Sequence, residues 1–149
     1  MKVGELCTRT VVVARPHEPV LIGGRRMRDL HVGCLVVVDD RPDGLHPVGI
    51  VTDRDLLTVL VGEHAGAEQR ALGDVMTRDL LLARETDDVN DALERMRARG
   101  VRRLPVVDRR GVLQGILAFD DLVEWMGEQL TDLAKLVANE QRREQVARP

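Results

Sequence analysis

Aromatic residues, cysteines and long apolar runs are all scarce in this chain of 149 residues. Phe119 and Trp125 are its only aromatic side chains, so aliphatic residues must build the core. No apolar run approaches the roughly 20 residues that cross a bilayer, and the N-terminus lacks the apolar stretch of a signal peptide. We therefore expect a cytoplasmic protein that makes no membrane contact.

Metal-binding, redox and nucleic-acid-binding patterns are also missing. Cys7 and Cys34 form no CxxC pair, and the four histidines are scattered at spacings that match no metal site. The net charge of −3 mixes both signs, without the broad positive field that nonspecific nucleic-acid binding needs. The sequence therefore predicts buried free cysteines, no structural metal and no nucleic-acid partner.

What the chain does contain is an internal repeat at an offset of 69 residues. Matching segments in the two copies include Thr8-Arg9 with Thr77-Arg78, Arg26-Met27-Arg28 with Arg95-Met96-Arg97, and Leu35 to Asp39 with Leu104 to Asp108. The first copy then has a connection three residues longer, after which Gly49-Ile50 matches Gly115-Ile116. This predicts two copies of one unit, at 1–61 and 71–127, joined by a small polar linker at 62–70.

Each unit has the pattern strand, helix, strand, strand, helix, which is typical of a mixed α/β (α+β) fold. The second strand of each unit, at 35–38 and 104–107, is a continuous apolar run, as expected when both faces of a sheet are covered. Val89, Ala92, Leu93 and Met96 form one helical stripe, and Asp87 and Asp88 are predicted to supply its N-terminal cap. Gly23 and Gly24 are expected to loosen the corresponding helix of the first unit.

Residues 128–149 are predicted to form an amphipathic helix and a charged tail, and the tail from Asn139 is expected to fray. One face of this helix carries the apolar residues Leu130, Leu133, Ala134 and Val137. Such a stripe must be buried, either on its own module or against a second chain. Of the two, homodimer contacts are the expected use.

The segment from Gly49 to Asp55 carries the pattern Gly-x-x-Thr-x-x-Asp, which puts a hydroxyl and a carboxylate at the start of a helix. A helix N-terminus attracts phosphate, and Thr52 can donate a hydrogen bond to it. Asp55 can accept hydrogen bonds from both hydroxyls of a ribose. The alternative is that Thr52 and Asp53 only cap the helix.

This heptad, Asp74-Val75-Met76-Thr77 and Arg103-Leu104-Pro105-Val106-Val107-Asp108 together resemble a tandem pair of cystathionine-beta-synthase (CBS) domains, also called a Bateman module. The resemblance covers nearly all of residues 3–127. It implies two β-α-β-β-α repeats that pack sheet to sheet with pseudo-twofold symmetry and form two clefts. In this family the clefts commonly bind AMP, ADP, ATP or S-adenosylmethionine, and stand-alone bacterial-type modules often form homodimers.

The resemblance also assigns residues to a first cleft, called cleft A. Thr52 and Asp55 would face Leu81, Arg102 and Arg103 from the other repeat, and planar guanidinium groups suit phosphate. Ile50 and Val51, like Leu81, could lie along the adenine. For these three residues the alternative is ordinary core packing, and for the arginines it is a solvated or ion-paired strand entry.

Cleft B, the second cleft, would hold Asp121 but has Ala118 at the threonine position. Gly33 and Cys34 stand where cleft A has its arginines, so cleft B is expected to hold phosphate poorly. One good site per chain is therefore predicted.

A regulatory, ligand-sensing module that binds an adenosine nucleotide and signals to an unidentified downstream protein is the leading hypothesis. No cofactor beyond that ligand is required. The second hypothesis is a scaffold or dimerisation module whose clefts stay empty. An enzyme is not expected, because no catalytic carboxylate pair, no Ser/His/Asp or Cys/His set and no glycine-rich phosphate loop is evident.

Overall fold

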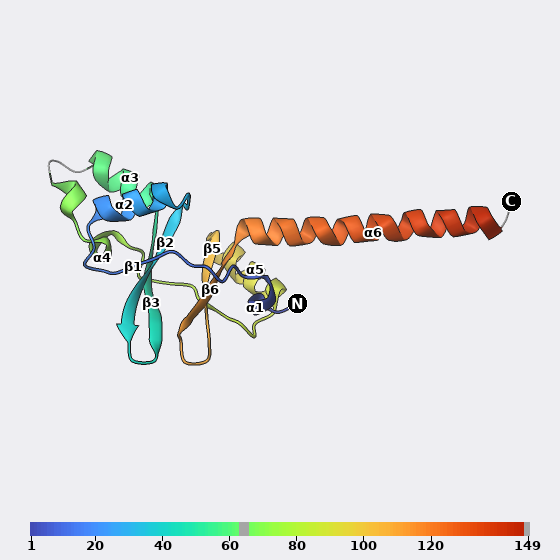
Figure 1. The fold of residues 1–149 in the computed structure, drawn as a ribbon, viewed down its shortest axis with the longest axis horizontal. Coiled ribbons are helices and arrows are strands. Elements are labelled where there is room, and N and C mark those ends of the chain that lie inside the picture. The colour runs from blue at the N-terminus through green and yellow to red at the C-terminus, as the bar shows by residue number, and fades with distance from the viewer. Residues whose placement is uncertain (63–65, 148–149) are drawn as a thin grey trace.

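The computed structural model of the chain describes residues 1–62 and 66–147; positions 63–65 of the expected linker and residues 148–149 lie outside that range. The elements up to residue 62 are α1 (Val3–Leu6), β1 (Val13–Ala14), α2 (Val20–Asp29), β2 (Cys34–Arg41), β3 (Gly44–Thr52) and α3 (Asp53–Gly62). Those that follow are η1 (Ala67–Gln69), α4 (Leu72–Val75), β4 (Ala83–Arg84), α5 (Val89–Arg99), β5 (Arg103–Val107), β6 (Leu113–Ala118) and α6 (Phe119–Ala147). The α/β prediction and the repeated β-α-β-β-α order are confirmed (Figure 1).

Two three-stranded sheets, β1-β2-β3 and β4-β5-β6, form the body of the molecule. Each begins with a parallel pair and ends with an antiparallel hairpin. The register also repeats, since Ala14 lies opposite Val37 and Ala83 lies opposite Val106. Both residues of each pair are 69 positions from their counterparts, so the internal repeat is a repeat in three dimensions.

The central strands β2 and β5 are buried on both faces, as their apolar runs predicted. In β2, Leu35 and Val37 pack into the core of the first repeat, which its own helices cover. Val36 and Val38 point the other way and are also fully buried. That second face lies where the two repeats meet, and β3 contacts β6 there. The predicted sheet-to-sheet packing therefore explains why these strands show no alternation of polar and apolar residues.

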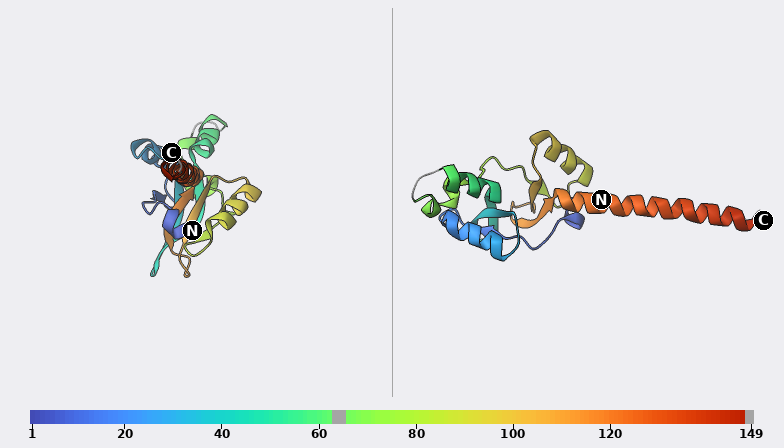
Figure 2. Two further views of the ribbon diagram at one scale, coloured as in Figure 1. Left: turned by 90° about the vertical axis from the view of Figure 1, so that its right-hand side faces the viewer. Right: turned by 90° about the horizontal axis from the view of Figure 1, so that it is seen from above.

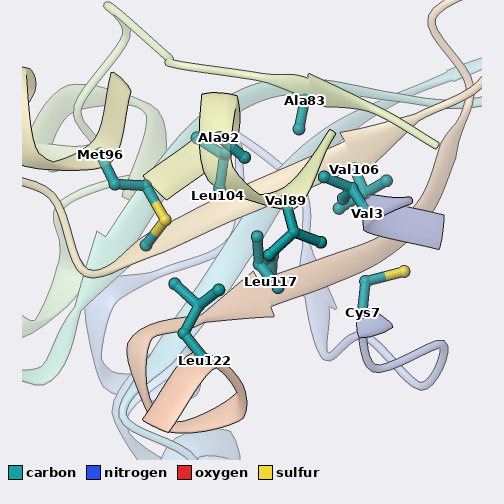
Figure 3. Packing of buried hydrophobic residues seen from close by; sticks show 10 residues of the cluster. All are labelled: Val3, Cys7, Ala83, Val89, Ala92, Met96, Leu104, Val106, Leu117 and Leu122. Carbon is teal, nitrogen blue, oxygen red and sulfur yellow. The ribbon is translucent and has the colours of Figure 1, made fainter. Parts of the chain in front are cut away.

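The short helices that open the two repeats are exchanged between them. Val3 and Cys7, from α1 and its end, lie in the core of the second repeat, as Figure 3 shows. Leu72 and Met76, from α4 and its end, lie in the core of the first repeat. Each repeat therefore needs a segment of the other to complete its core.

Reciprocal backbone hydrogen bonds fix this exchange at the edges of the sheets. Thr8 and Ile116 exchange two N–H···O bonds of 2.9 Å, and Ile50 and Thr77 do the same at 3.1 and 2.9 Å. Each bridge adds one residue of the incoming segment to the outer strand, β6 or β3. The two bridges are equivalent under the repeat, which agrees with the pseudo-twofold symmetry that the resemblance implies.

The long helix α6 departs from the prediction. The amphipathic helix was expected to begin at residue 128, but α6 is one helix of 29 residues that begins at Phe119 and continues through Gly127. Its charged segment after Asn139 is included in the helix as far as Ala147. A glycine inside a helix costs only about 1 kcal/mol, which the good helix formers around Gly127 can offset. The far part of α6 extends away from the body of the molecule (Figures 1 and 2).

Within residues 1–62 and 66–147, no helix combines the length and the apolar character needed to cross a membrane.

A carboxylate and an arginine form the same partly buried contact in both repeats. Glu18 accepts hydrogen bonds from the Arg26 guanidinium, and Asp87 accepts one from Arg95. Each carboxylate also accepts the backbone N–H of the residue three positions earlier. The Arg26 guanidinium lowers the pKa of the Glu18 carboxyl group below its ordinary value.

Replacing Glu18 by glutamine is expected to lower the free energy of unfolding by about 1–2 kcal/mol at neutral pH, because a charged hydrogen bond is lost. Since the folded state has the lower pKa, the wild-type carboxylate stabilises fully above the unfolded pKa of about 4.3. That contribution is lost as the pH falls through the folded pKa, so the two proteins converge in acid. Urea unfolding between pH 3 and pH 7 measures this. Glu94→Gln, at an exposed site, is the control, and a pH-independent difference contradicts the prediction.

Candidate functional site

The two hairpins each lead directly into a helix, and a carboxylate closes each junction. After β3, the Thr52 N–H donates to Asp55 Oδ2 at 2.8 Å, and the Asp55 N–H donates to Thr52 Oγ1 at 3.2 Å. After β6, the Ala118 N–H donates to Asp121 Oδ2 at 2.7 Å. Asp55 and Asp121 are therefore equivalent, and in both only Oδ2 is engaged among the described residues, which leaves Oδ1 for another donor.

Both carboxylates are partly exposed, and both belong to the first turn of their helices, α3 and α6. The two junctions differ in the residue before the helix. Thr52 adds a hydroxyl that caps α3, whereas Ala118 adds none. The capping role that the sequence left open for Thr52 is thus real, and it does not occupy the second oxygen of Asp55.

Arg103, the first residue of β5, reaches across to the first repeat. Its Nη2 atom lies about 3.3 Å from where a Cβ on Gly33 would stand, and Asp53 Oδ2 lies 3.5 Å from the same point. The side chain is only partly exposed. Among the described residues no hydrogen bond or ion pair engages its guanidinium group. A half-buried, unpaired arginine is thus available to an anion at the junction of the repeats.

A cavity of about 260 Å³ opens beside this arginine. Its walls come from both repeats: Thr8, Thr10, Val11, Val12, His31, Val32, Gly33 and Cys34 from the first half of the chain, and Arg103, Ile116, Ala118, Asp120 and Asp121 from the second. Because it contains Asp121 and Ala118, this cavity is cleft B.

The assignment of Arg103 to cleft A stays a prediction, because the cavity shows only that this side chain also lines cleft B. The sequence placed it in cleft A and left cleft B without a cation, yet its guanidinium lines the cavity of cleft B. The physical reason is its position. Arg103 and Cys34 occupy equivalent strand starts that face each other across the pseudo-twofold axis, so a long side chain from one reaches the cleft of the other.

Arg102 makes local contacts instead. Its guanidinium lies 5.2 Å from the centre of the Phe119 ring and 3.9 Å from Asp120 at the start of α6. This is the ion-paired strand entry that the sequence left open. The loose contact and high exposure of Arg102 leave its side chain free to rearrange.

The three aliphatic candidates for the base differ in burial. Val51 is fully buried in the core of the first repeat, so its side chain is a core residue and only its backbone can face a ligand. Ile50 is partly exposed and lies beside Thr77 of the exchanged segment. Leu81 is also partly exposed, although it packs against the core of the second repeat.

Cys34 lines the cavity as a thiol. Burial raises its pKa, an effect that the nearby Arg103 opposes only in part. Cys7 is likewise free and buried, so the prediction of two buried, unpaired cysteines is confirmed. In this environment the Cys34 thiol stays protonated at neutral pH and contributes a small apolar surface to the wall.

Several wall residues were missed by the sequence, although the repeat contains the signal for two of them. Shifting Leu81 back by 69 positions gives Val12, and the match of Gly49-Ile50 with Gly115-Ile116 makes Ile116 the counterpart of Ile50. Both line the cavity. Thr10 and His31 have no such signal. His31 follows α2 with a positive φ of 53°, a backbone geometry that a histidine in the sequence does not predict.

The comparisons with known proteins agree with this fold. The family model of the CBS domain matches residues 3–62 and 72–128. An uncharacterized protein of Methanopyrus kandleri is 32% identical over 124 residues, which cover 83% of this chain and 62% of that protein, so the chain spans less than two thirds of this relative.

Two further relatives carry functional names. An inosine-5'-monophosphate dehydrogenase of Thermoplasma acidophilum is 34% identical over 115 residues, which cover 77% of this chain but only 21% of the enzyme. A crystal structure of CBSX2 in complex with AMP is 31% identical, has a TM-score of 0.73, and is matched over 87% of this chain and 98% of that one.

Proposed function

Because this chain belongs to the CBS domain family and carries two CBS domains in tandem, we propose that it is a regulatory module that binds an adenosine nucleotide between its repeats. The observation that carries the proposal is the unpaired guanidinium of Arg103 in a cavity that both repeats line. Its similarity to CBSX2, whose structure holds AMP, supports the class of ligand.

Cleft B is the favoured site because it contains that cavity. In it, Arg103 would pair with phosphate, and the free Oδ1 of Asp121 would accept the ribose hydroxyls. Val12 and Ile116 offer aliphatic surfaces to the base. The volume of about 260 Å³ is just below the usual range of small-ligand pockets, so an occupant no larger than one nucleotide is expected.

Cleft A is the second candidate, and the Thr52–Asp55 pair favours it. The Oδ1 of Asp55 could take the ribose there, with the hydroxyl of Thr52 beside it and Ile50 and Leu81 along the base. Positive charge for the phosphate would come from the start of β5, where Arg103 lies and Arg102 precedes it. Arg102 would first have to leave its ion pair with Asp120. The positions of these two guanidinium groups determine how many phosphates the site can bind. They therefore determine which ligand it prefers among AMP, ADP, ATP and S-adenosylmethionine.

A ligand between the repeats would contact both of them, so binding would shift the angle between the repeats and the position of α6. A downstream protein could recognise this change. Such coupling requires that two conformations bind the ligand with different affinity. We expect the module to act as a cytoplasmic homodimer and to regulate rather than catalyse.

Calorimetric titration with AMP, ADP, ATP and S-adenosylmethionine tests the proposal. Asp55→Ala and Asp121→Ala form a matched pair, since each removes one equivalent carboxylate and one cap hydrogen bond of 2.8 or 2.7 Å. Loss of binding in only Asp121→Ala assigns cleft B, and loss in only Asp55→Ala assigns cleft A. Arg103→Ala is expected to weaken ATP binding about 10- to 100-fold, with exposed Arg109→Ala as the control.

Failure would also be informative. If none of the four ligands produces heat with the folded wild-type protein, the nucleotide-sensing proposal is wrong, and the scaffold hypothesis takes its place. If Arg103→Ala and Arg109→Ala weaken binding equally, the positive charge acts at long range and Arg103 is not in the site.

A further inference from the structure

The helix α6 exposes a row of large apolar side chains that begins beside the body and continues along the part that extends beyond it. Val123, Met126, Leu130, Leu133 and Val137, called the α6 stripe here, are each 50–65% exposed. Monomeric proteins rarely leave such a continuous apolar row in water. Figures 1 and 2 show that no other element of the chain lies along the outer part of this helix.

The spacing of the stripe is that of a coiled coil. Its members follow one another at alternating intervals of three and four residues, the a and d positions of a heptad. The pattern begins near the point where α6 leaves the body and continues for two heptads. At the next two positions stand Glu140 and Glu144, which end the apolar row.

The charges around the stripe favour a second copy of the same chain as its partner. The positions that flank it are uncharged between residues 127 and 136: Gly127, Gln129, Ala134 and Leu136. The charged residues Glu124, Glu128, Asp132 and Lys135 lie on the opposite side of the helix. Two identical helices can therefore meet along the stripe without like-charge repulsion.

We infer that α6 is a self-association helix, which pairs with α6 of a second copy along the α6 stripe. This specifies the surface of the homodimer in the proposed function and does not depend on a ligand. Burial of the five side chains in both copies removes roughly 1,000 Å² of surface, just below the range of stable interfaces. The dimer is therefore reversible and depends on protein concentration.

Sedimentation equilibrium of the full chain, from micromolar to near-millimolar concentration, tests the inference. The wild type is expected to shift from its monomer mass of 16.6 kDa toward twice that value. Leu130→Glu with Leu133→Glu is expected to raise the dissociation constant at least about 100-fold, because charges would be buried in the interface. The control, Thr131→Glu with Asn139→Glu, adds the same charge on the other face and should leave it unchanged.

The variants keep the helix and the clefts, because glutamate forms helices about as well as leucine and the replaced residues are exposed. Circular dichroism confirms folding, and nucleotide titration of the same variants tests the ligand proposal separately. A wild type that stays monomeric at every concentration overturns the inference. So does a stripe variant that dimerises as well as its control, since the dimer would then use another surface.

Discussion

Replacing Leu72 by alanine is expected to lower the free energy of unfolding by about 2–5 kcal/mol, the range for buried leucines. Leu72 is fully buried in the core of the first repeat, although it precedes the strands of the second. Its methyl groups lie 3.0 and 3.2 Å from where a Cβ on Gly23 would stand. Because Gly23 has no side chain to move into the gap, the cavity left by the substitution cannot close cheaply.

Urea unfolding of Leu72→Ala and of the control Leu57→Ala measures this effect. Leu57 lies in α3 of the same repeat and is 61% exposed, so its loss should change stability by less than about 0.5 kcal/mol. Hydrogen exchange shows where the structure is destabilised: if α4 completes the core of the first repeat, the amides of β2 should lose protection in Leu72→Ala. Equal stability losses in the two variants would show that Leu72 does not belong to this core.

The exchange of α1 and α4 could not be read from the sequence, although the topology could. Comparison at an offset of 69 residues shows which segments are equivalent, and the repeated order of strands followed from it. It does not show which core an equivalent segment enters. Val3 and Leu72 have the same pattern whether each packs on its own repeat or on the other, and only the three-dimensional arrangement decides.

Gly23 shows the same limit. The sequence assigned it a loosening effect on α2, on the basis of helix propensity alone. In the structure it also provides the space that Leu72 fills, a tertiary reason that propensity does not contain. The prediction for the last helix was wrong in a different way: its expected start at residue 128 lies inside α6, which continues through Gly127 with no atom within 4 Å of the Cβ position there.

For the candidate site, the residues fixed by the backbone were easier to anticipate than the long side chains. The Thr52–Asp55 and Asp121 junctions follow from the repeated hairpin and helix start. Strand alternation could have excluded Val51, which lies between Ile50 and Thr52 and so points to the other face. The direction of Arg103 was not predictable, because a flexible side chain beside a pseudo-twofold axis can enter either cleft.

Replacing Gly115 by alanine is the second change with a large expected effect, a loss of about 2–3 kcal/mol. A Cβ at this buried position would stand 2.7 Å from the Cys7 Sγ atom and 2.8 Å from the Thr8 carbonyl oxygen. The carbonyl cannot retreat, because it accepts the Ile116 N–H in the bridge that holds the exchanged segment. The added methyl group must therefore push α1 and its following segment away from β6.

The same displacement reaches the proposed ligand site, because Thr8 and Ile116 both line the cavity of cleft B. Gly115→Ala should thus weaken nucleotide binding there as well as stability, whereas a ligand in cleft A would be less affected. Gly127→Ala is the matched control: no atom lies within 4 Å of its Cβ position, and alanine should stabilise α6 by up to about 1 kcal/mol. Thermal unfolding of the two variants, compared with the wild type, measures these opposite changes in stability. If Gly115→Ala is as stable as the wild type, the Thr8 segment yields to the methyl group, and the close packing of the exchanged helix is not what holds the two repeats together.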